Sequence, residues 1–265
     1  MNWEETIRYI RSQSEYSDLI KYAYLEEDLS LNLERYRQSG EFWEILRIFK
    51  QYSPKAHKIL DVGCGNGTTS IALALEGYEV TAVEPDKSDT VGTAAIQRLS
   101  EQYNVNNIAI IGSVLENVSL PNESFDIVFI RQAMHHANDL EIFISKAATL
   151  LKQGGLLLTI RDHVIFDEED KEWFLVNHPL HKFYGGENAY RPDEYKMAII
   201  KSGLTLIKEI KYYESVINYY PQEDPQKQYE IWKKSKKERW GNILANDCVL
   251  FFYSRIKGIF PLNEK

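Results

Sequence analysis

The segment Ile59–Asp86, ILDVGCGNGTTSIALALEGYEVTAVEPD, carries the pattern that decides the fold. A short apolar run comes first, glycines stand at alternate positions after it, and a second apolar run ends on an acid. The pattern predicts a strand to Val62, a turn at Gly63, Gly65 and Gly67, a helix over 68–76, and a strand over 80–83 that ends at Glu84. This order of elements is typical of one half of a nucleoside-binding α/β unit.

The glycine turn has the chemistry of a ligand site. Glycine allows positive φ and lets a ligand approach the main chain closely, since no Cβ stands in the way. The turn leads into a helix N-terminus, where free backbone N–H groups attract anions. Glu84 follows the glycines at about the 20-residue spacing of dinucleotide-binding folds, so we expect its carboxylate to accept both hydroxyls of a ribose.

The glycine spacing separates two kinds of cofactor. Nicotinamide and flavin folds use G-x-G-x-x-G. This chain instead has D-x-G-x-G-x-G from Asp61 to Gly67, and Thr68 stands where the third dinucleotide glycine would be. The DVGCGNG turn resembles motif I of the class I S-adenosylmethionine-dependent methyltransferases, and Glu84 resembles that family's ribose-binding acid.

Other segments continue the resemblance over residues 55–162. SFDIVF (124–129) resembles the family's fourth strand, LKQGGLLL (151–158) the turn into its fifth, and MHHAND (134–139) the L-H-H-x-x-D segment of many small-molecule members. The resemblance implies S-adenosyl-L-methionine as the cofactor. It also implies that residues of the turn and of the strand ends bind it: Asp61, Gly63, Cys64, Gly65, Gly67, Glu84, Pro85, Ser113, Val114 and Arg131.

The loop after the third strand departs from the family pattern. The family often has an acid there that bonds the adenine amino group, whereas this chain reads GSVLE over 112–116. Ser113 can accept a hydrogen bond, and Val114 can stack on the base and present its backbone N–H. We therefore expect adenine to bind here without an assigned acid.

The composition bounds the class of protein. The 265 residues carry a formal net charge of −8, which argues against nucleic acid as a partner, because nucleic-acid-binding proteins usually have a basic face. Cys64 and Cys248 cannot make a disulfide framework or a zinc site. The N-terminal MNWEETIRYIRSQ lacks the apolar region of a secretory signal, and no apolar run approaches the roughly 20 residues of a membrane helix. We expect a cytoplasmic, soluble protein with no membrane partner.

The expected fold is α/β: a Rossmann-like, doubly wound sheet, mostly parallel with an antiparallel terminal strand, plus an N-terminal helical cap. The cap covers residues 1–54 and the methyltransferase-like domain 55–265, with insertions near 162–191 and 221–246. Strands are predicted near 58–62, 79–84, 108–112, 125–131, 156–161, 204–213 (or as far as 219) and 247–257, and helices near 67–76, 90–102, 138–151 and 192–202. The basic run over 233–239 is assigned to a solvated helix face.

The carboxyl ends of parallel strands meet at one edge of such a sheet, which is where ligands bind. This rule brings Gly63, Glu84, Ser113, Arg131 and Arg161 to one rim. We expect Arg131, Gln132 or Arg161 to contact the cofactor carboxylate or the acceptor, and we assign Arg161 to the acceptor.

Histidines gather where an acceptor would bind. Five of the six fall within 135–181, and histidine is the natural base near neutral pH. His136 follows the fourth predicted strand and His163 the fifth, so both are predicted to face the acceptor, with His163 favoured as the base. Asp162 would orient or charge a histidine.

The segment FYGGENAYR (183–191) is interpreted as a substrate lid. Paired glycines permit a sharp hinge, and Tyr184, Glu187 and Tyr190 offer donors and acceptors to a substrate. A metal reading stays open for this region, because Asp162, His163, His178 and His181 together could ligate one ion. Pro179 makes the necessary helical spacing doubtful, so the sequence predicts no metal.

The missing motifs narrow the acceptor. No Asn/Asp-Pro-Pro-Tyr follows the fourth predicted strand, and no Pro-Cys nucleophile is present, so methylation of nucleobases is disfavoured. We predict methyl transfer from S-adenosylmethionine to a small polar molecule, with O-methylation slightly favoured over N-methylation because of the histidines. The alternatives are a non-catalytic nucleoside-binding protein and an NAD-dependent oxidoreductase.

Overall fold

One mixed sheet organises the molecule. The computed structural model describes residues 1–210, 214–219, 230 and 249–254, and the strands within these ranges lie in the order β3-β2-β1-β4-β5-β7-β6. They are β1 (Lys58–Val62), β2 (Glu79–Val83), β3 (Ile108–Ile111), β4 (Phe125–Arg131), β5 (Leu151–Asp162), β6 (Thr205–Ile210) and β7 (Val249–Ser254). β1 to β5 pair in parallel, and β7 pairs antiparallel with both β5 and β6. The predicted Rossmann-like sheet with an antiparallel terminal strand is confirmed.

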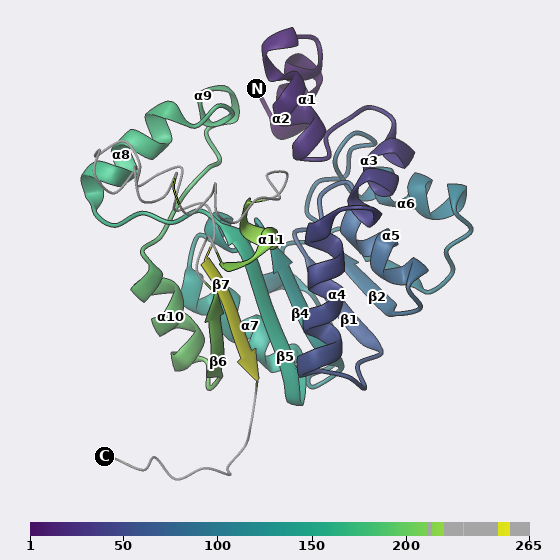
Figure 1. Ribbon diagram of the computed structural model, residues 1–265, viewed down its shortest axis with the longest axis vertical. Coiled ribbons are helices and arrows are strands. Elements are labelled where there is room, and N and C mark those ends of the chain that lie inside the picture. Colours follow the sequence, from purple (N-terminus) through teal and green to yellow (C-terminus); the bar gives the residue numbers. More distant parts are fainter. Residues whose placement is uncertain (211–213, 220–229, 231–248, 255–265) are drawn as a thin grey trace.

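Helices cover both faces of this sheet (Figure 1). The helices on one face are α3 (Leu29–Arg37), α4 (Gly40–Tyr52), α5 (Thr68–Leu75) and α6 (Thr93–Gln102), and those on the other are α7 (Leu140–Leu150) and α10 (Pro192–Lys201). Successive strand residues point to opposite layers, so Ile59 packs in the first layer and Leu60 in the second. Both are fully buried, which is why these strands read as continuous apolar runs.

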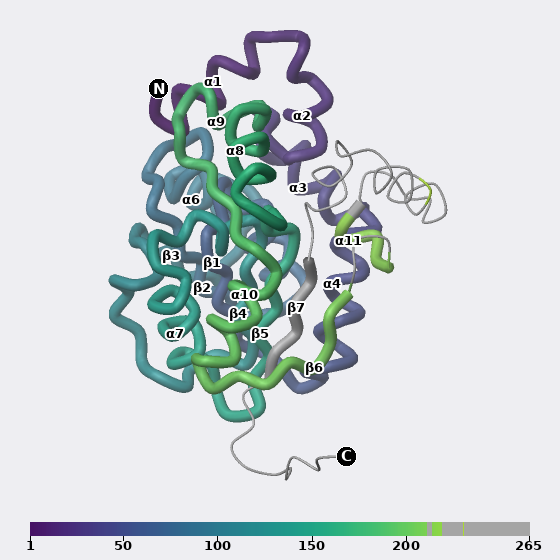
Figure 2. Tube along the Cα trace, turned by 90° about the vertical axis from the view of Figure 1, so that its left-hand side faces the viewer, coloured from purple at the N-terminus to yellow at the C-terminus, as the bar shows by residue number. Residues whose placement is uncertain are grey.

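The N-terminal segment has two separate roles. α4 fills the sheet face with Phe42, Ile45 and Phe49. α1 (Trp3–Arg11), η1 (Ser14–Tyr16) and α2 (Ser17–Tyr22) instead lie beyond the carboxyl ends of the strands, as Figure 2 shows from the side. There α1 packs beside α9 (His181–Tyr184), which follows α8 (Glu168–Asn177). An apolar cluster joins Ile7 of α1 to Leu180 just before α9. Only the first part of the segment therefore covers the rim where ligands bind.

Two predicted boundaries need correction. β5 begins at Leu151 and not near 156, because Leu151 already pairs with Phe125 of β4. The strand predicted from 204 ends at Ile210, and its extension to 219 is wrong, because α11 (Val216–Tyr219) is helical and buries Ile217 in the core layer that contains α4. The insertion near 221–246, with its basic run, lies outside the described residues except for Glu230.

Within the described ranges, none of the helices combines the length and the apolar character that bilayer crossing requires.

Candidate active site

The glycine turn between β1 and α5 forms the floor of a cavity. Gly63 and Gly67 have φ of +66° and +80°, which side chains rarely adopt. A Cβ on Gly63 would lie 2.4 Å from Cβ of Ala133, and one on Gly67 would lie 2.8 Å from Cγ1 of Ile96. The turn therefore needs glycine at both positions, for its conformation and for its close packing.

Asp61 links the strand before this turn to the helix after it. It is buried, and the Ser70 hydroxyl donates to Asp61 Oδ2 at 2.6 Å, which ties β1 to α5. Burial raises the pKa of the Asp61 carboxyl to about 6, although the Ser70 hydrogen bond opposes the shift. The structure places neither Asp61 nor Gly67 in the cavity lining, so any effect of these two predicted residues on a cofactor would be indirect.

Glu84 closes the turn from the end of β2. Its carboxylate accepts the Gly65 N–H at 2.7 Å and the Asp86 N–H at 2.9 Å, and only 8% of the residue is exposed. Burial raises the pKa of the Glu84 carboxyl to about 7, although these two backbone donors lower it. The acid thus lies at the glycine turn, as the sequence spacing predicted.

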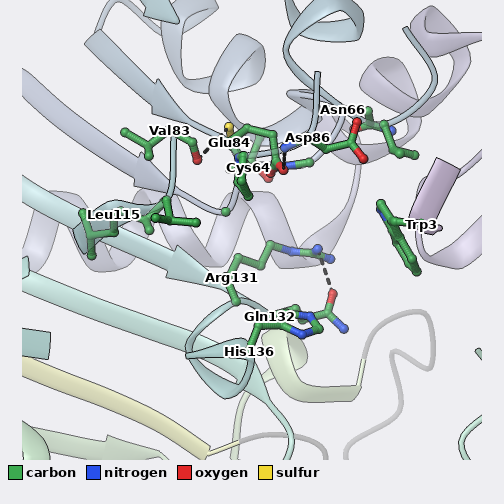
Figure 3. A pocket seen from close by; sticks show the side chains of 18 of the residues that line it. Trp3, Cys64, Asn66, Val83, Glu84, Asp86, Leu115, Arg131, Gln132 and His136 are labelled. Carbon is green, nitrogen blue, oxygen red and sulfur yellow. Dashed lines mark hydrogen bonds between the residues drawn. The ribbon is translucent and has the colours of Figure 1, made fainter. Parts of the chain in front are cut away.

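The cavity has a volume of about 630 Å³ and opens at the carboxyl ends of the strands. Figure 3 shows Trp3, Glu84, Arg131 and His136 around it. Of the residues predicted to bind a cofactor or an acceptor, those that line it are Gly63, Cys64, Gly65, Glu84, Pro85, Ser113, Val114, Arg131, Gln132, His136 and Tyr184. One continuous cavity therefore joins the glycine turn to the predicted acceptor side.

The loop after β3 supplies an apolar wall. Val114 is 42% exposed, and Leu115 behind it is buried at the start of η2 (Leu115–Asn117). The Ser113 hydroxyl donates to the carbonyl of Val114 at 3.0 Å, so its oxygen can still accept a hydrogen bond. A flat aromatic base could lie against Val114 here.

A buried ion pair fixes Arg131 at the end of β4. Its Nε donates to Glu41 Oε1 at 2.7 Å, and Glu41 of α4 is completely buried. Burial opposes ionisation of Glu41, but Arg131 and Arg161 outweigh it and lower the pKa of that carboxyl. The guanidinium also lies over the rings of Tyr24 and Tyr36, at 5.6 and 5.8 Å from their centroids.

Arg161 does not line the cavity, although it was predicted to bind the acceptor. Its Nη1 donates to Ile217 O at 3.0 Å and to Glu41 Oε2 at 3.4 Å. The rim rule placed the residue at the correct strand end, but the buried carboxylate of Glu41 and the carbonyl of Ile217 hold its side chain.

His136 lines the predicted acceptor side of the cavity from η3 (Met134–His136). Its Nδ1 lies 2.9 Å from Gly186 O, and because a carbonyl can only accept, Nδ1 carries the proton in this contact. The close cavity wall and neighbouring His135 lower the pKa of His136 to about 4, although the residue keeps an exposed edge toward the cavity opening. The neutral ring therefore keeps an unprotonated Nε2 at neutral pH.

His163 does not line this cavity, although it was predicted to face the acceptor. Its ring packs between His135 and Phe174 of α8, with centroid separations of 4.4 and 4.8 Å. α8 covers the residue from outside, and no helix was predicted within 162–191.

The predicted lid is anchored to the body of the protein. Glu187 is buried with 8% of its surface exposed, the Tyr184 hydroxyl bonds to its Oε1, and the Tyr190 hydroxyl donates to Ala137 O at 2.7 Å. Burial opposes ionisation of Glu187, but the adjacent imidazoles outweigh it and hold its pKa well below the usual range. Among Tyr184, Glu187 and Tyr190, only Tyr184 lines the cavity. The centroid of its ring lies 4.8 Å from that of Trp3.

Sequence reasoning did not single out three residues that also line the cavity, in α1, in the loop before α3 and in the glycine turn. Trp3, Tyr24 and Asn66 line the cavity, and the Asn66 side chain donates to Tyr24 O at 2.7 Å. Glu41 had a readable signal, because it lies on the same helical face as Ile45 and Ile48, where an acid is unexpected without a partner.

Comparisons with known proteins agree with this geometry. Residues 60–159 match the family model of a methyltransferase domain. The ubiquinone biosynthesis O-methyltransferase of Agrobacterium fabrum is 24% identical over 175 residues, which cover 62% of this chain and 68% of that protein. The uncharacterized methyltransferase YcgJ of Bacillus subtilis is 31% identical over 58% of this chain and 60% of its own length.

Solved structures share the fold. The crystal structure of YcgJ aligns with a TM-score of 0.59 and 20% identity, over 82% of this chain and 99% of that one. The geranyl diphosphate C-methyltransferase of Streptomyces coelicolor, solved with Mg²⁺, geranyl diphosphate and S-adenosyl-L-homocysteine, aligns with a TM-score of 0.63 and 14% identity, over 96% and 97% of the two chains.

Proposed function

We propose that this chain, which belongs to the class I S-adenosylmethionine-dependent methyltransferases, methylates a small polar acceptor, on oxygen in preference to nitrogen. The observation that carries the proposal is a neutral His136 in the same cavity as the glycine turn and Glu84. The choice of oxygen has the further support of a relative named as an O-methyltransferase. The oxidoreductase and the non-catalytic binding protein have no such relative among those described above.

The residues around the glycine turn fit the cofactor. We assign the ribose hydroxyls to Glu84, the adenine to Ser113 and Val114, and the amino-acid part to the backbone of Gly63 and Gly65. Cys64 and Pro85 complete the walls of this part.

Arg131 is proposed to hold the carboxylate of the cofactor. A guanidinium has five N–H groups, and the described contacts to Glu41 and Gln132 use three of them. The other two can bond a carboxylate without disturbing the buried pair. Arg161 is no longer part of the proposed acceptor site, and neither are Glu187 and Tyr190.

His136 is the proposed base. When bound, the cofactor supplies an electrophilic methyl group on its sulfonium. His136 Nε2 takes the proton of the acceptor hydroxyl while Nδ1–H stays bonded to Gly186 O, which fixes the tautomer. Tyr184 and Trp3 face the same space, and we infer that they exclude water from it. We also propose that residues 1–54 act as the cap of a domain that starts near residue 55.

The first experiment tests cofactor and reaction together. Thermal unfolding of the purified chain should shift upward with S-adenosylmethionine and S-adenosylhomocysteine, and not with NAD, because a ligand stabilises the state that binds it. Labelled methyl transfer to a panel of phenols, sugars and amines should then select hydroxyl acceptors. A shift with NAD alone, or labelling of amines only, would overturn the corresponding part of the proposal.

The protonation of Glu84 predicts a pH-dependent cofactor affinity. Since the carboxylate is the better acceptor for ribose hydroxyls, and its pKa is about 7, the affinity for S-adenosylmethionine should fall as the pH drops below 7, by at most about tenfold per unit. Titration calorimetry measures this affinity between pH 5.5 and 8.5, a range that extends about one unit or more to either side of the Glu84 pKa.

The variant Glu84→Gln serves as the control, because the cofactor amino group also titrates. At pH 8 it should bind about 10- to 100-fold more weakly, since hydrogen bonds to a charged group are lost. The part of the pH dependence that belongs to Glu84 should vanish in the variant. An unchanged pH profile would show that another group, such as Asp61 or Asp86, controls binding.

A further inference from the structure

We propose that His135, His163 and Glu187 bind one divalent transition-metal ion, of the class represented by Zn²⁺, behind the acceptor wall of the cavity. His135 lies in η3, His163 directly follows β5, and Glu187 lies in the loop after α9. One nitrogen or oxygen of each lies within 4.8 Å of the others. Metal binding here does not depend on methyl transfer, so the two proposals can fail separately.

The distances from Glu187 to the two imidazoles fit a shared metal better than they fit hydrogen bonds. Glu187 Oε2 lies 3.4 Å from His135 Nε2 and 3.5 Å from His163 Nε2. Charge-assisted N–H···O bonds are shorter, about 2.7–2.9 Å. Tetrahedral Zn²⁺ has bonds of about 2.0–2.1 Å to nitrogen and about 2.0–2.2 Å to carboxylate oxygen, which places neighbouring ligands about 3.3–3.5 Å apart.

The carboxylate oxygen involved is buried and lacks a hydrogen bond. Glu187 Oε2 has no hydrogen-bond partner within the described part of the chain, whereas Oε1 bonds to the Tyr184 hydroxyl. A buried charged oxygen without a donor is costly, and a cation between it and the two imidazoles would satisfy it.

Asp162 sets the tautomer that ligation requires. Its Oδ1 accepts the ring Nδ1–H of His135 at 2.9 Å and the backbone N–H of the same residue at 3.1 Å. With the proton on Nδ1, the lone pair of Nε2 faces Glu187. A carboxylate behind a ligating histidine is the usual support of a zinc site.

The ligand types select the metal class. Two imidazole nitrogens and one carboxylate oxygen suit Zn²⁺, Fe²⁺, Co²⁺ and Ni²⁺ better than Mg²⁺ or Ca²⁺, which prefer oxygen ligands. Three protein ligands also leave one tetrahedral position for an oxygen from water or from another molecule. This set differs from the one considered in the sequence, since Asp162 supports a ligand and His181 is outside the cluster.

The ion would fasten the 162–191 segment to the sheet edge. Tyr184, which lines the cavity, bonds to Glu187, and Gly186 O bonds to His136. A metal held by Glu187 would therefore fix the acceptor-side wall and the proposed base together.

The test measures bound metal directly. The tag-free chain is stripped with a chelator, incubated with Zn²⁺ or Co²⁺, separated from free ions, and analysed for metal by mass spectrometry. We expect about one ion per chain, and visible d–d absorption of the Co²⁺ form typical of tetrahedral coordination. The variants Glu187→Gln and His163→Asn should lose the ion and the absorption, while Asp162→Asn should lower the affinity by about 10- to 100-fold.

A matched control guards against surface chelation. His57 is exposed and directly precedes β1, whereas the cluster lies at the other ends of the strands, so His57→Gln should keep the ion. Circular dichroism of each stripped variant separates loss of metal from loss of fold. The proposal is overturned if the wild-type chain retains no ion, or if Glu187→Gln and His163→Asn both retain it. Either result would identify the cluster as a histidine–carboxylate contact only.

Discussion

Replacing His136 by glutamine should lower kcat for the hydroxyl acceptor by about 10²- to 10⁴-fold, the usual contribution of a positioned general base. Cofactor affinity should change little, because His136 and Glu84 lie on different sides of the cavity, as Figure 3 shows. Single-turnover methyl transfer with the acceptor chosen by the panel measures the chemical step, and calorimetry measures cofactor binding.

The pH profile adds a second readout for His136. Its pKa of about 4 predicts that the wild-type kcat holds its value down to mildly acidic pH and falls as the pH approaches 4. His57→Gln, at an exposed histidine near the opposite strand ends, should behave as the wild type. If the acceptor must lose a proton and His136→Gln retains full kcat, another base performs the step.

The second large effect concerns the fold. Glu41→Gln should lower the free energy of unfolding by about 3–5 kcal/mol, because it leaves Arg131 and Arg161 in a buried site without a full counter-charge. Urea denaturation at neutral pH measures this. The same variant should weaken cofactor binding, since the guanidinium of Arg131 would no longer be held against Tyr24 and Tyr36.

Glu44→Gln is the matched control on the same helix. Glu44 pairs with Arg47 at 2.6 Å, but more than half of the Arg47 side chain is exposed, so this pair should contribute at most about 1 kcal/mol. The pH dependence of the free energy of unfolding further distinguishes Glu41→Gln from Glu44→Gln. The folded-state pKa of Glu41 is lowered, so its contribution is present above the unfolded value near 4.5 and is lost as the pH falls through the folded pKa. Equal losses in both variants would contradict the buried-pair assignment.

The glycine turn could be predicted from sequence because its constraints are local. β1 was expected over 58–62 and is found there, and the helix after the turn begins at Thr68. Positive φ at Gly63 and Gly67 and the acid at Glu84 are fixed by spacing within a single βαβ unit, so no knowledge of distant contacts was needed.

The histidine cluster could not be predicted in full, because its members meet only through tertiary contacts. His135 and His163 follow β4 and β5, which are neighbours in the sheet, so their proximity was within reach of the topology. Glu187 joins them from a loop whose path depends on α8 and α9, and those short helices carry little apolar periodicity of their own. For the same reason the sequence could not show that His136, and not His163, lines the cavity.

Two groups of residues from different parts of the chain line the cavity. The region that matches the methyltransferase domain, residues 60–159, contains the glycine turn, Glu84 and His136, whereas Trp3, Tyr24 and Tyr184 come from the flanking segments. Substitution of Tyr184 can reshape the proposed acceptor side, while Glu84 keeps its contacts with the glycine turn. Selection can thus retarget such an enzyme to a new metabolite by remodelling its edges, with the methyl donor unchanged.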